Sequence, residues 1–266
     1  MKQNNKTPKQ LLAAVRCGDY AHPGEEEAIQ IALKYMAKSP YQLLLDVGCG
    51  LGGTAKYIKD SGYGIPYGID IDKSAIEYAK QKYSDIEFVL CDVSVATKTI
   101  MHKSFDVIYL FNSFYAFKDQ EGSLIELSKL SKDSTQLIIF DYMMPSISEQ
   151  VSSPFAPERN IFARPNFIPI YENNIEPLLL RTGWQMESLI NMGAEYAIWY
   201  RQFVSLLEQQ KDKLIAEFGH QLYEWAAESY SDLLYRLENK TVSGALIIAK
   251  KSAANKSGIN KLYSNK

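Results

Sequence analysis

The residues best placed for chemistry lie in one short stretch, where an apolar run passes into a cluster of glycines. Leu43 to Thr54 reads LLLDVGCGLGGT, with Gly48, Gly50, Gly52 and Gly53 between the apolar run and a helix-forming segment. Glycines at such a turn allow positive φ and remove Cβ atoms, so a ligand can lie against the backbone and the amino end of the helix. This stretch therefore predicts a cofactor loop.

Two cofactors fit such a loop, and the charge of one side chain separates them. Gly48, Gly50 and Gly53 satisfy the dinucleotide pattern G-x-G-x-x-G, and the acid Asp70 ends the next apolar run. However, the Asp46 carboxylate lies shortly before the first glycine, where it would repel a pyrophosphate. It suits a ligand with positive charge and no phosphate, such as S-adenosylmethionine, which carries a sulfonium and an α-amino group. The pattern D-x-G-x-G-x-G therefore favours S-adenosylmethionine over NAD.

Positioning these residues requires strands that end at a common edge. From Gln42 onward, short apolar runs alternate with helix-length segments, which predicts an α/β fold with a parallel sheet. The expected strands are Gln42–Val47, Pro66–Asp70, Glu87–Cys91, Phe105–Phe111 and Gln136–Asp141, and the expected helices are Gly24–Ala37, Gly53–Asp60, Ser74–Lys82 and Gln120–Ser131. The near-continuous apolar character of the strands indicates burial on both faces.

The second half of the chain departs from this alternation. Five prolines interrupt Met143–Ile170, and Ala194–Glu238 is helical in pattern and rich in aromatic residues. A helix over Ile175–Arg181 and strands over Trp184–Met192 and Val242–Lys250 complete the pattern. We therefore expect one domain over 1–266, comprising a helical segment (1–41), a cofactor-binding core (42–142), two cap insertions (143–172 and 194–240) and a flexible basic tail (252–266).

Composition limits the classes of function. A chain of 266 residues that is 46% hydrophobic and 23% charged can bury a core, and it has no apolar run of membrane-spanning length. Nine cations lie in the terminal stretches 1–18 and 250–266, leaving 20 basic and 31 acidic residues between them. That acidic body disfavours nucleic acid as a partner, and we interpret the basic termini as solubilising ends. The polar amino terminus and three scattered cysteines predict a cytoplasmic protein with free thiols and no metal cluster.

The motifs together resemble those of class I S-adenosylmethionine-dependent methyltransferases. The resemblance rests on Asp46 to Gly52, on Asp70 in GIDID and on Asp92 in LCDV, in this order and spacing. A narrower similarity to phosphoethanolamine and to sarcosine or glycine N-methyltransferases rests on GDYAHPGEEEAI, FDVIYLFNSFYAF, IIFDY and SGALIIAKK. The phosphobase branch has a histidine shortly after the fourth strand, where this chain has Ala116. The resemblance implies a Rossmann-like sheet of seven strands, mostly parallel, with the last strand inserted antiparallel.

The resemblance also implies a role for each motif residue. Asp70 would accept hydrogen bonds from the ribose hydroxyls, Asp92 from the adenine amino group, and Ile71 and Val93 would sandwich the adenine ring. The remaining residues assigned to the cofactor are Asp46, Gly48, Cys49, Gly50, Gly52 and Tyr109. Two alternatives stay open, because Cys49 also suits apolar packing and Asp92 also suits a turn.

The acceptor site is predicted from position alone. Methyl transfer from a sulfonium needs a nucleophile held in line and water excluded, so no universal catalytic residue marks it. The side chains that follow strand ends or precede the first strand are Asn112, Tyr115, Tyr142, Tyr20 and His22, with Trp199 from the late helical segment. We assign His22 and Tyr20 as proton acceptors and the other four to the substrate. His22 equally suits a helix entry beside Pro23. Core packing is the favoured interpretation for most of the late aromatics, and a minority could form a cation–π box for an ammonium group.

The reaction predicted from these residues is methyl transfer to the amine or hydroxyl of a small molecule. Two alternatives remain: an RNA or protein methyltransferase, and a protein that binds S-adenosylmethionine without transferring its methyl group. The acidic body disfavours the first alternative. Turnover of labelled cofactor tests the second.

Overall fold

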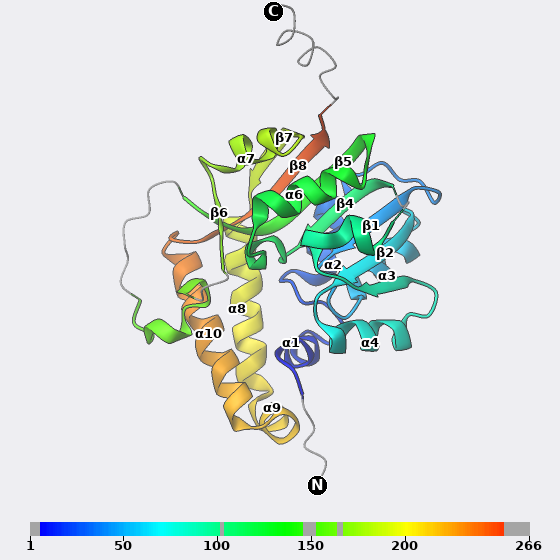
Figure 1. The fold of residues 1–266 in the computed structure, drawn as a ribbon. Coiled ribbons are helices and arrows are strands. Elements are labelled where there is room, and N and C mark those ends of the chain that lie inside the picture. Colours follow the sequence, from blue (N-terminus) through cyan, green and yellow to red (C-terminus); the bar gives the residue numbers. More distant parts are fainter. Residues whose placement is uncertain (1–5, 102–103, 146–152, 164–166, 253–266) are drawn as a thin grey trace, which may run out of the picture.

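The protein is built around one mixed sheet, which the computed structural model describes together with its helices over residues 6–101, 104–145, 153–163 and 167–252 (Figure 1). Its strands are β1 (Leu43–Val47), β2 (Ile65–Asp70), β3 (Glu87–Leu90), β4 (Phe105–Phe111), β5 (Ser131–Met144), β6 (Ile170–Tyr171), β7 (Trp184–Asn191) and β8 (Ser243–Lys251). The order is β3-β2-β1-β4-β5-β8-β7, with β6 paired to β5. Strands β1 to β6 pair in parallel, and β8 runs antiparallel between β5 and β7. The predicted Rossmann-like fold with an inserted antiparallel last strand is confirmed.

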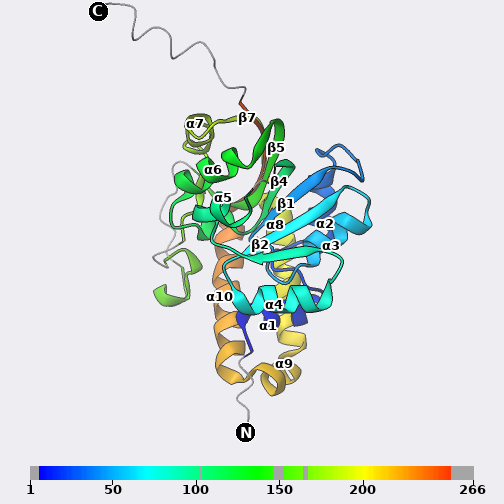
Figure 2. The same ribbon diagram turned by 45° about the vertical axis from the view of Figure 1, so that its right-hand side comes forward.

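Helices cover both faces of the sheet. They are α1 (Pro8–Arg16), α2 (Glu25–Leu33), α3 (Gly53–Asp60), α4 (Lys73–Lys82), α5 (Ala96–Thr99), α6 (Gln120–Lys129), α7 (Ile175–Arg181), α8 (Gly193–Gln209), α9 (Lys211–Phe218) and α10 (His220–Glu238), with 3-10 turns η1 (Val93–Val95), η2 (Phe114–Ala116), η3 (Pro157–Arg159) and η4 (Ile161–Ala163). Helices α5, α6 and α7 pack on one face of the sheet, while α1, α2, α8 and α10 share the hydrophobic cluster on the other. The two ribbon views show α8 and α10 side by side (Figures 1 and 2).

Strand alternation decides which side chains meet the late helices. In β4, Tyr109 and Phe111 point to the cluster that contains α2 and α8, whereas Ile108 and Leu110 point to the opposite cluster. Successive side chains of a strand face opposite sides of a sheet. Tyr142 of β5 lies on the same side as Tyr109. The predicted acceptor residues at these strand ends therefore face α8.

Several predicted boundaries are wrong, each for a local reason. The helical stretch over Ala194–Glu238 consists of three helices, because the chain turns at Gln210 and again at Gly219, which has φ 84°. Strand β5 begins at Ser131 instead of Gln136, because Ser131 already pairs with Phe105 of β4. Helix α2 is shorter than predicted and begins after Gly24, which has φ 75°.

Some sequence-based predictions concern residues outside the described part of the chain. The tail predicted over 252–266 is described only at residue 252, and the first cap insertion lacks a description at 146–152 and 164–166. Within the described ranges, no helix combines the length and the apolar character that crossing a bilayer requires.

Candidate functional site

The glycine loop between β1 and α3 requires glycine at several positions. Gly48, Gly50 and Gly52 have φ of 79°, 53° and 87°, in the left-handed region where a Cβ atom is disfavoured. A Cβ atom on Gly48 would also clash with the Ser113 side chain, whereas one on Gly50 would approach only Ala21, at 3.6 Å. A Cβ atom on Gly52 would clash with the Phe88 ring, so the backbone is held tightly at both ends of the loop and is open in its middle.

Beneath this loop, Asp46 is a buried acid with an unused oxygen. It pairs in register with Tyr109 of β4 and is only 2% exposed, and its Oδ2 has no hydrogen-bond partner among the described residues. Burial raises the pKa of Asp46 well above its usual range, the charge of Asp70 adds to the rise, and the Tyr109 hydroxyl acts against it. A cationic group brought to this carboxylate would offset the cost of its burial.

The Asp70 carboxylate at the end of β2 is held by backbone and by a lysine. Its Oδ2 accepts a hydrogen bond of 2.8 Å from Gly50 N–H, and its Oδ1 accepts one of 2.8 Å from Asp72 N–H. The Lys9 ammonium of α1 lies 3.1 Å from both oxygens. Asp70 is thus fixed beside the glycine loop, and its role in binding ribose stays a prediction.

The three residues predicted around adenine line one edge of the sheet. Ile71 follows β2 and is 70% exposed, an unusual exposure for an isoleucine, whereas Val93 of η1 is buried. Asp92 is exposed at the surface, and its Oδ1 accepts a 2.9 Å hydrogen bond from Ser94 N–H as the cap of η1. Asp92 therefore occupies the turn position that was one of its two interpretations, and its other oxygen accepts no hydrogen bond from the described residues.

Cys49 sits inside the loop but faces the interior. Its side chain belongs to the cluster formed by Ala55, Ile76 and Phe88, and burial raises its pKa well above the usual range. A thiol held neutral in this way is a poor nucleophile. The geometry therefore agrees with the packing interpretation of this side chain.

On the other side of the loop, Asn112 and Asp141 lie at the ends of β4 and β5. Asn112 has φ 48°, its Oδ1 accepts a 3.0 Å hydrogen bond from the Tyr196 hydroxyl of α8, and its Nδ2 is buried without a partner among the described residues. The Asp141 carboxylate accepts from Tyr142 N–H at 2.7 Å and from Tyr115 N–H at 3.2 Å. Burial raises the pKa of Asp141 to about 7, although these backbone donors oppose the rise.

Tyrosines from three segments meet above these strand ends. The rings of Tyr115 and Tyr142 have centroids 5.1 Å apart, and the Tyr142 hydroxyl forms a short hydrogen bond with the Tyr200 hydroxyl of α8. Tyr196 also contacts Tyr142, with ring centroids 5.7 Å apart. Sequence analysis assigned Tyr115 and Tyr142 to the acceptor but missed Tyr196 and Tyr200, whose helical spacing on α8 is equally typical of core residues.

His22 is less accessible than predicted. It is 2% exposed; Nδ1 lies 3.1 Å from the Pro23 carbonyl oxygen and Nε2 lies 2.9 Å from Thr54 Oγ1. A carbonyl oxygen only accepts, so Nδ1 carries the proton and Nε2 accepts from the Thr54 hydroxyl. Burial lowers the pKa of His22 to about 4. The ring is therefore neutral and bridges the entry of α2 to α3.

The two remaining predicted residues lie close to α2. The Tyr20 hydroxyl donates to Glu26 at 3.2 Å, and its ring lies near His22, with centroids 5.8 Å apart. Trp199 of α8 donates from Nε1 to Glu27 at 2.9 Å, and Gly24 leaves room for its ring. Tyr20 thus joins the loop before α2 to that helix, and Trp199 joins α8 to it.

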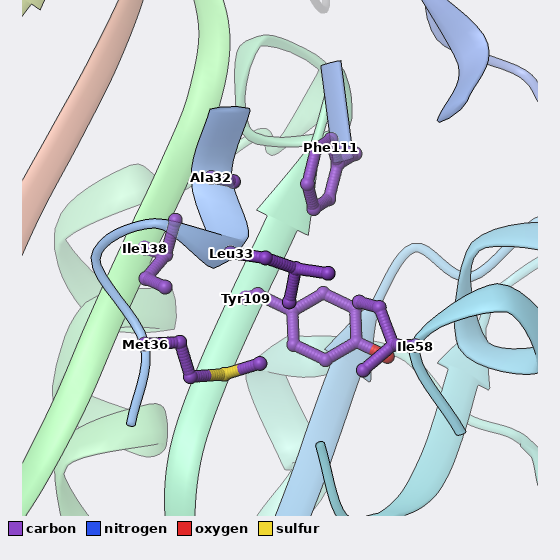
Figure 3. Close-up of a pocket in the computed structure, with 7 residues that line it drawn as sticks. All are labelled: Ala32, Leu33, Met36, Ile58, Tyr109, Phe111 and Ile138. Atoms are coloured by element: carbon purple, nitrogen blue, oxygen red, sulfur yellow. The ribbon is translucent and has the colours of Figure 1, made fainter. Parts of the chain in front are cut away.

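One small cavity lies between α2, α3 and the sheet. Figure 3 shows the ring of Tyr109 between apolar side chains of α2, α3 and the sheet, and the lining residues are Ala32, Leu33, Met36, Ile58, Tyr109, Phe111 and Ile138. Its walls are apolar, whereas the amino acid and ribose parts of a nucleoside cofactor need polar partners. This cavity therefore belongs to the core, and the candidate site is the edge formed by the glycine loop, Asp70 and the ends of β4 and β5.

The chain is similar to known methyltransferases. Residues 45–139 match the family described as a methyltransferase domain. A phosphoethanolamine N-methyltransferase of Triticum aestivum is 25% identical over 204 residues, covering 74% of this chain and 38% of that protein. This chain therefore spans less than half the length of that relative.

Solved structures share the fold across nearly the whole chain. Phosphoethanolamine N-methyltransferase 2 of Haemonchus contortus, in complex with phosphomonomethylethanolamine and S-adenosylhomocysteine, has a TM-score of 0.77 at 16% identity, covering 94% of this chain and 59% of that one. A sarcosine dimethylglycine methyltransferase from Galdieria sulphuraria, described as putative, has a TM-score of 0.74 at 12% identity, covering 93% and 99%. The sequence-based resemblance to class I S-adenosylmethionine-dependent methyltransferases is confirmed, because the matched domain and the phosphoethanolamine N-methyltransferases agree with it and the solved structures share the fold.

Proposed function

We propose that this chain transfers a methyl group from S-adenosylmethionine to the amine or hydroxyl of a small molecule. The observation that carries the proposal is the buried Asp46 carboxylate, whose Oδ2 has no hydrogen-bond partner among the described residues, beneath a glycine loop that Asp70 holds in place. A buried acid with a free oxygen suits a cofactor with a cationic amino group, and it disfavours a pyrophosphate. When bound, S-adenosylmethionine would supply a methyl group on a sulfonium: the lone pair of the acceptor bonds to the methyl carbon in line as the C–S bond breaks, and S-adenosylhomocysteine leaves as a neutral thioether.

The residues that would hold this cofactor come from four neighbouring strand ends. Gly48, Gly50 and Gly52 keep the loop clear of side chains, and Asp70 offers its carboxylate to the ribose hydroxyls. Exposed Ile71 supplies an apolar surface for the adenine ring opposite Val93, and the free oxygen of Asp92 would accept from the adenine amino group. Tyr109 and Cys49 support the loop from within.

We place the acceptor among Asn112, Tyr115 and Tyr142. The unpartnered Asn112 Nδ2 is a buried donor that a polar acceptor would satisfy, and the tyrosine rings exclude water from its surroundings. Trp199 would position the acceptor indirectly, since its indole nitrogen is already bonded to Glu27. The sequence relatives named for phosphoethanolamine and the polar, aromatic lining both support a small acceptor.

Proton removal from the acceptor is assigned to His22 or Tyr20. His22 is neutral, as a base must be, but its Nε2 lone pair accepts from Thr54 and a pKa of about 4 makes it a weak base near pH 7. Burial raises the pKa of the Tyr20 hydroxyl, and the Glu26 carboxylate raises it further, so this hydroxyl keeps its proton. These features favour catalysis mainly by positioning of the acceptor. Replacing His22 tests whether a proton acceptor is needed as well.

The cofactor assignment is tested at Asp70. Replacing Asp70 by Ala removes the acceptor for the ribose hydroxyls and for Gly50 N–H, which we expect to weaken binding of S-adenosylhomocysteine by about 1.5–3 kcal/mol, roughly one to two decades. Calorimetry measures this directly. Unchanged affinity would refute the role of Asp70, and tight NAD binding without S-adenosylhomocysteine binding would refute the choice of cofactor.

The reaction itself is tested by turnover. Labelled S-adenosylmethionine is incubated with a panel of small amines, amino acids, phosphoamines and hydroxyl compounds, and labelled product is separated from cofactor. Transfer to one member supports the proposal. Binding of cofactor without transfer to any small molecule, with transfer to RNA or protein instead, would favour the macromolecular alternative.

A further inference from the structure

The Asp70 carboxylate has no free hydrogen-bonding position in this structure. An ionised carboxylate offers about four lone-pair positions, two on each oxygen. Gly50 N–H takes one on Oδ2, Asp72 N–H takes one on Oδ1, and the Lys9 ammonium lies within 3.1 Å of both oxygens. The backbone donors shape the loop and must stay. The two ribose hydroxyls therefore need the positions that Lys9 holds.

Helix α1 is built to bring Lys9 to this place. Thr7 caps the helix through its side chain, Gln10 completes a capping box, and Pro8 occupies the first turn. Lys9 also lies 3.4 Å from Asp72, so a single ammonium group faces two acids. Ala13, one turn further, packs on Leu51 of the glycine loop. The helix thus lies directly across the loop, and Figure 1 shows it between α4 and α8.

The two ends of α1 are held with different strength. At its carboxyl end, the Arg16 side chain is 2% exposed, pairs with Glu25 at 2.7 Å and stacks over the Phe203 ring of α8. Near its amino end, Lys6 pairs with Glu217 of α9, an acid that is 40% exposed, whereas the Asp70 partner of Lys9 is 6% exposed. A pair with an exposed acid contributes little, and the pair of Lys9 with a buried acid contributes more. Lys9 is therefore the main polar contact that holds the amino end of α1 on the loop.

We propose that α1 is a strap over the cofactor site, with Lys9 holding Asp70 until the cofactor displaces it. The inference rests on the proposed role of Asp70 in binding ribose. Because the ribose hydroxyls and the ammonium group compete for the same two oxygens, cofactor binding releases the amino end of α1. The buried Arg16 end stays in contact with α8 and acts as the hinge.

Binding of S-adenosylhomocysteine to Lys9→Met tests the competition. Methionine keeps an unbranched stem in place of the lysine and removes the charge, so the strap loses its hold on Asp70 without losing its apolar packing. We expect the variant to bind S-adenosylhomocysteine roughly three to ten times more tightly than the unmodified protein. Lys9→Arg keeps a cation at this position and should stay close to the unmodified affinity.

A matched control removes the same charge elsewhere. Lys59 of α3 pairs with Asp85 on the surface, away from Asp70, so Lys59→Met changes the net charge equally and should leave affinity unchanged. Equal tightening in Lys59→Met and Lys9→Met would assign the effect to net charge and overturn the strap. Weaker or unchanged binding in Lys9→Met would overturn it as well, because Lys9 would then assist the cofactor or take no part.

Hydrogen exchange gives a readout that is independent of affinity. Backbone amides of 9–13 should exchange faster when S-adenosylhomocysteine binds, the reverse of the usual protection by a ligand, and those near Arg16 should change little. Slower or unchanged exchange over 9–13 would overturn release of the strap. Asp70→Ala separates the two proposals: if it weakens binding while Lys9→Met does not tighten it, only the strap fails, and if it has no effect, the ribose assignment fails first.

Discussion

The cofactor region and the acceptor region fix their polar groups over very different distances along the chain. In the cofactor region, formed by Asp46, the glycine loop and Asp70, the key hydrogen bond joins Gly50 to Asp70, 20 residues apart. In the acceptor region, formed by the ends of β4 and β5 with α8, Asn112 meets Tyr196 over 84 residues and Tyr142 meets Tyr200 over 58. The first region is fixed by backbone geometry, and the second by the packing of rings from separate elements.

This contrast indicates how each region tolerates change. A site built on backbone N–H groups and positive φ angles needs particular residues at particular positions, whereas a site of packed tyrosines can exchange one ring for another and alter its shape. We therefore expect substitutions in the loop to abolish binding and substitutions under α8 to change acceptor preference.

The largest expected effect comes from Gly48→Ala. A residue with a Cβ atom in the left-handed region costs about 1–2 kcal/mol, and the clash with Ser113 adds roughly 1–3 kcal/mol. Denaturant unfolding should show this loss of stability, and calorimetry should show that binding of S-adenosylhomocysteine is lost.

Gly219→Ala is the matched control in the late helices. Gly219 also has a positive φ, 84°, with ψ 154°, and no atom lies within 4 Å of its Cβ position. Only the conformational cost of a Cβ atom applies there, so this variant should lose stability and keep its affinity for S-adenosylhomocysteine. Loss of affinity in Gly219→Ala as well would show that a general loss of stability, and not the place of Gly48 in the loop, accounts for the loss of binding.

The next effect is a pair of opposite pH dependences of stability. The pKa of His22 falls from 6.5 to about 4 on folding, so its contribution to stability is present above pH 6.5 and is lost as the pH falls toward 4. The pKa of Asp141 rises from 3.8 to about 7, so its contribution is present below pH 3.8 and is lost as the pH rises toward 7. Each dependence amounts to about 3–4 kcal/mol over its range.

Two variants separate these contributions in unfolding measurements across pH 4 to 8. His22→Gln should remove the loss of stability that His22 causes as the pH falls. The Asp141 contribution is then unopposed, so the stability of this variant falls more steeply as the pH rises. Asp141→Asn should remove the loss of stability that Asp141 causes as the pH rises. The His22 contribution is then unopposed, so the stability of this variant rises between pH 4 and pH 6.5. Parallel profiles in both variants and the unmodified protein would contradict the burial of these two groups.

The same separations along the chain explain how far the sequence predicts each region. Asp46, Gly48 and Asp70 are recognisable because their spacing and chemistry lie within one strand-loop-helix-strand stretch. Strand β4 was predicted with its observed bounds, since FDVIYLF is continuously apolar. Tyr200 was not predicted, because nothing in its neighbours along the chain indicates that its hydroxyl reaches Tyr142 on β5.

Helix α1 lies in the segment predicted to be helical (1–41), but the role predicted for its charges is wrong. The sequence interpretation makes Lys9 and Arg16 part of a solubilising basic end, whereas Lys9 contacts two acids and Arg16 is buried. The interpretation of residues 1–18 as a solubilising end is therefore wrong for this helix. The signal lies in TPKQ, where Thr7 and Gln10 form a capping box and Pro8 occupies the first turn, which marks the start of an ordered helix.

A smaller effect is expected from His22→Ala at the level of catalysis. If His22 is the proton acceptor, turnover should fall on the order of a hundredfold while affinity for S-adenosylhomocysteine stays the same. Thr54→Val is the control, because it removes the hydrogen bond to Nε2 and keeps the imidazole. If turnover survives in His22→Ala at every pH tried, or falls equally in Thr54→Val, His22 serves only to join the entry of α2 to α3.

The last prediction compares the exchange of backbone amides in the two regions. Residues 143–170 and 194–238 are expected to form a cap, and α8 places Tyr196 and Tyr200 over Asn112 and Tyr142. An acceptor that fills this space would add contacts to α8, so amides of the cap should exchange more slowly when cofactor and acceptor are both bound. The strap over the cofactor should respond in the opposite direction, because its amino end is released. Equal exchange over 194–238 in the free and bound protein would mean that α8 to α10 keep the same structure and mobility, and that the acceptor binds without moving them.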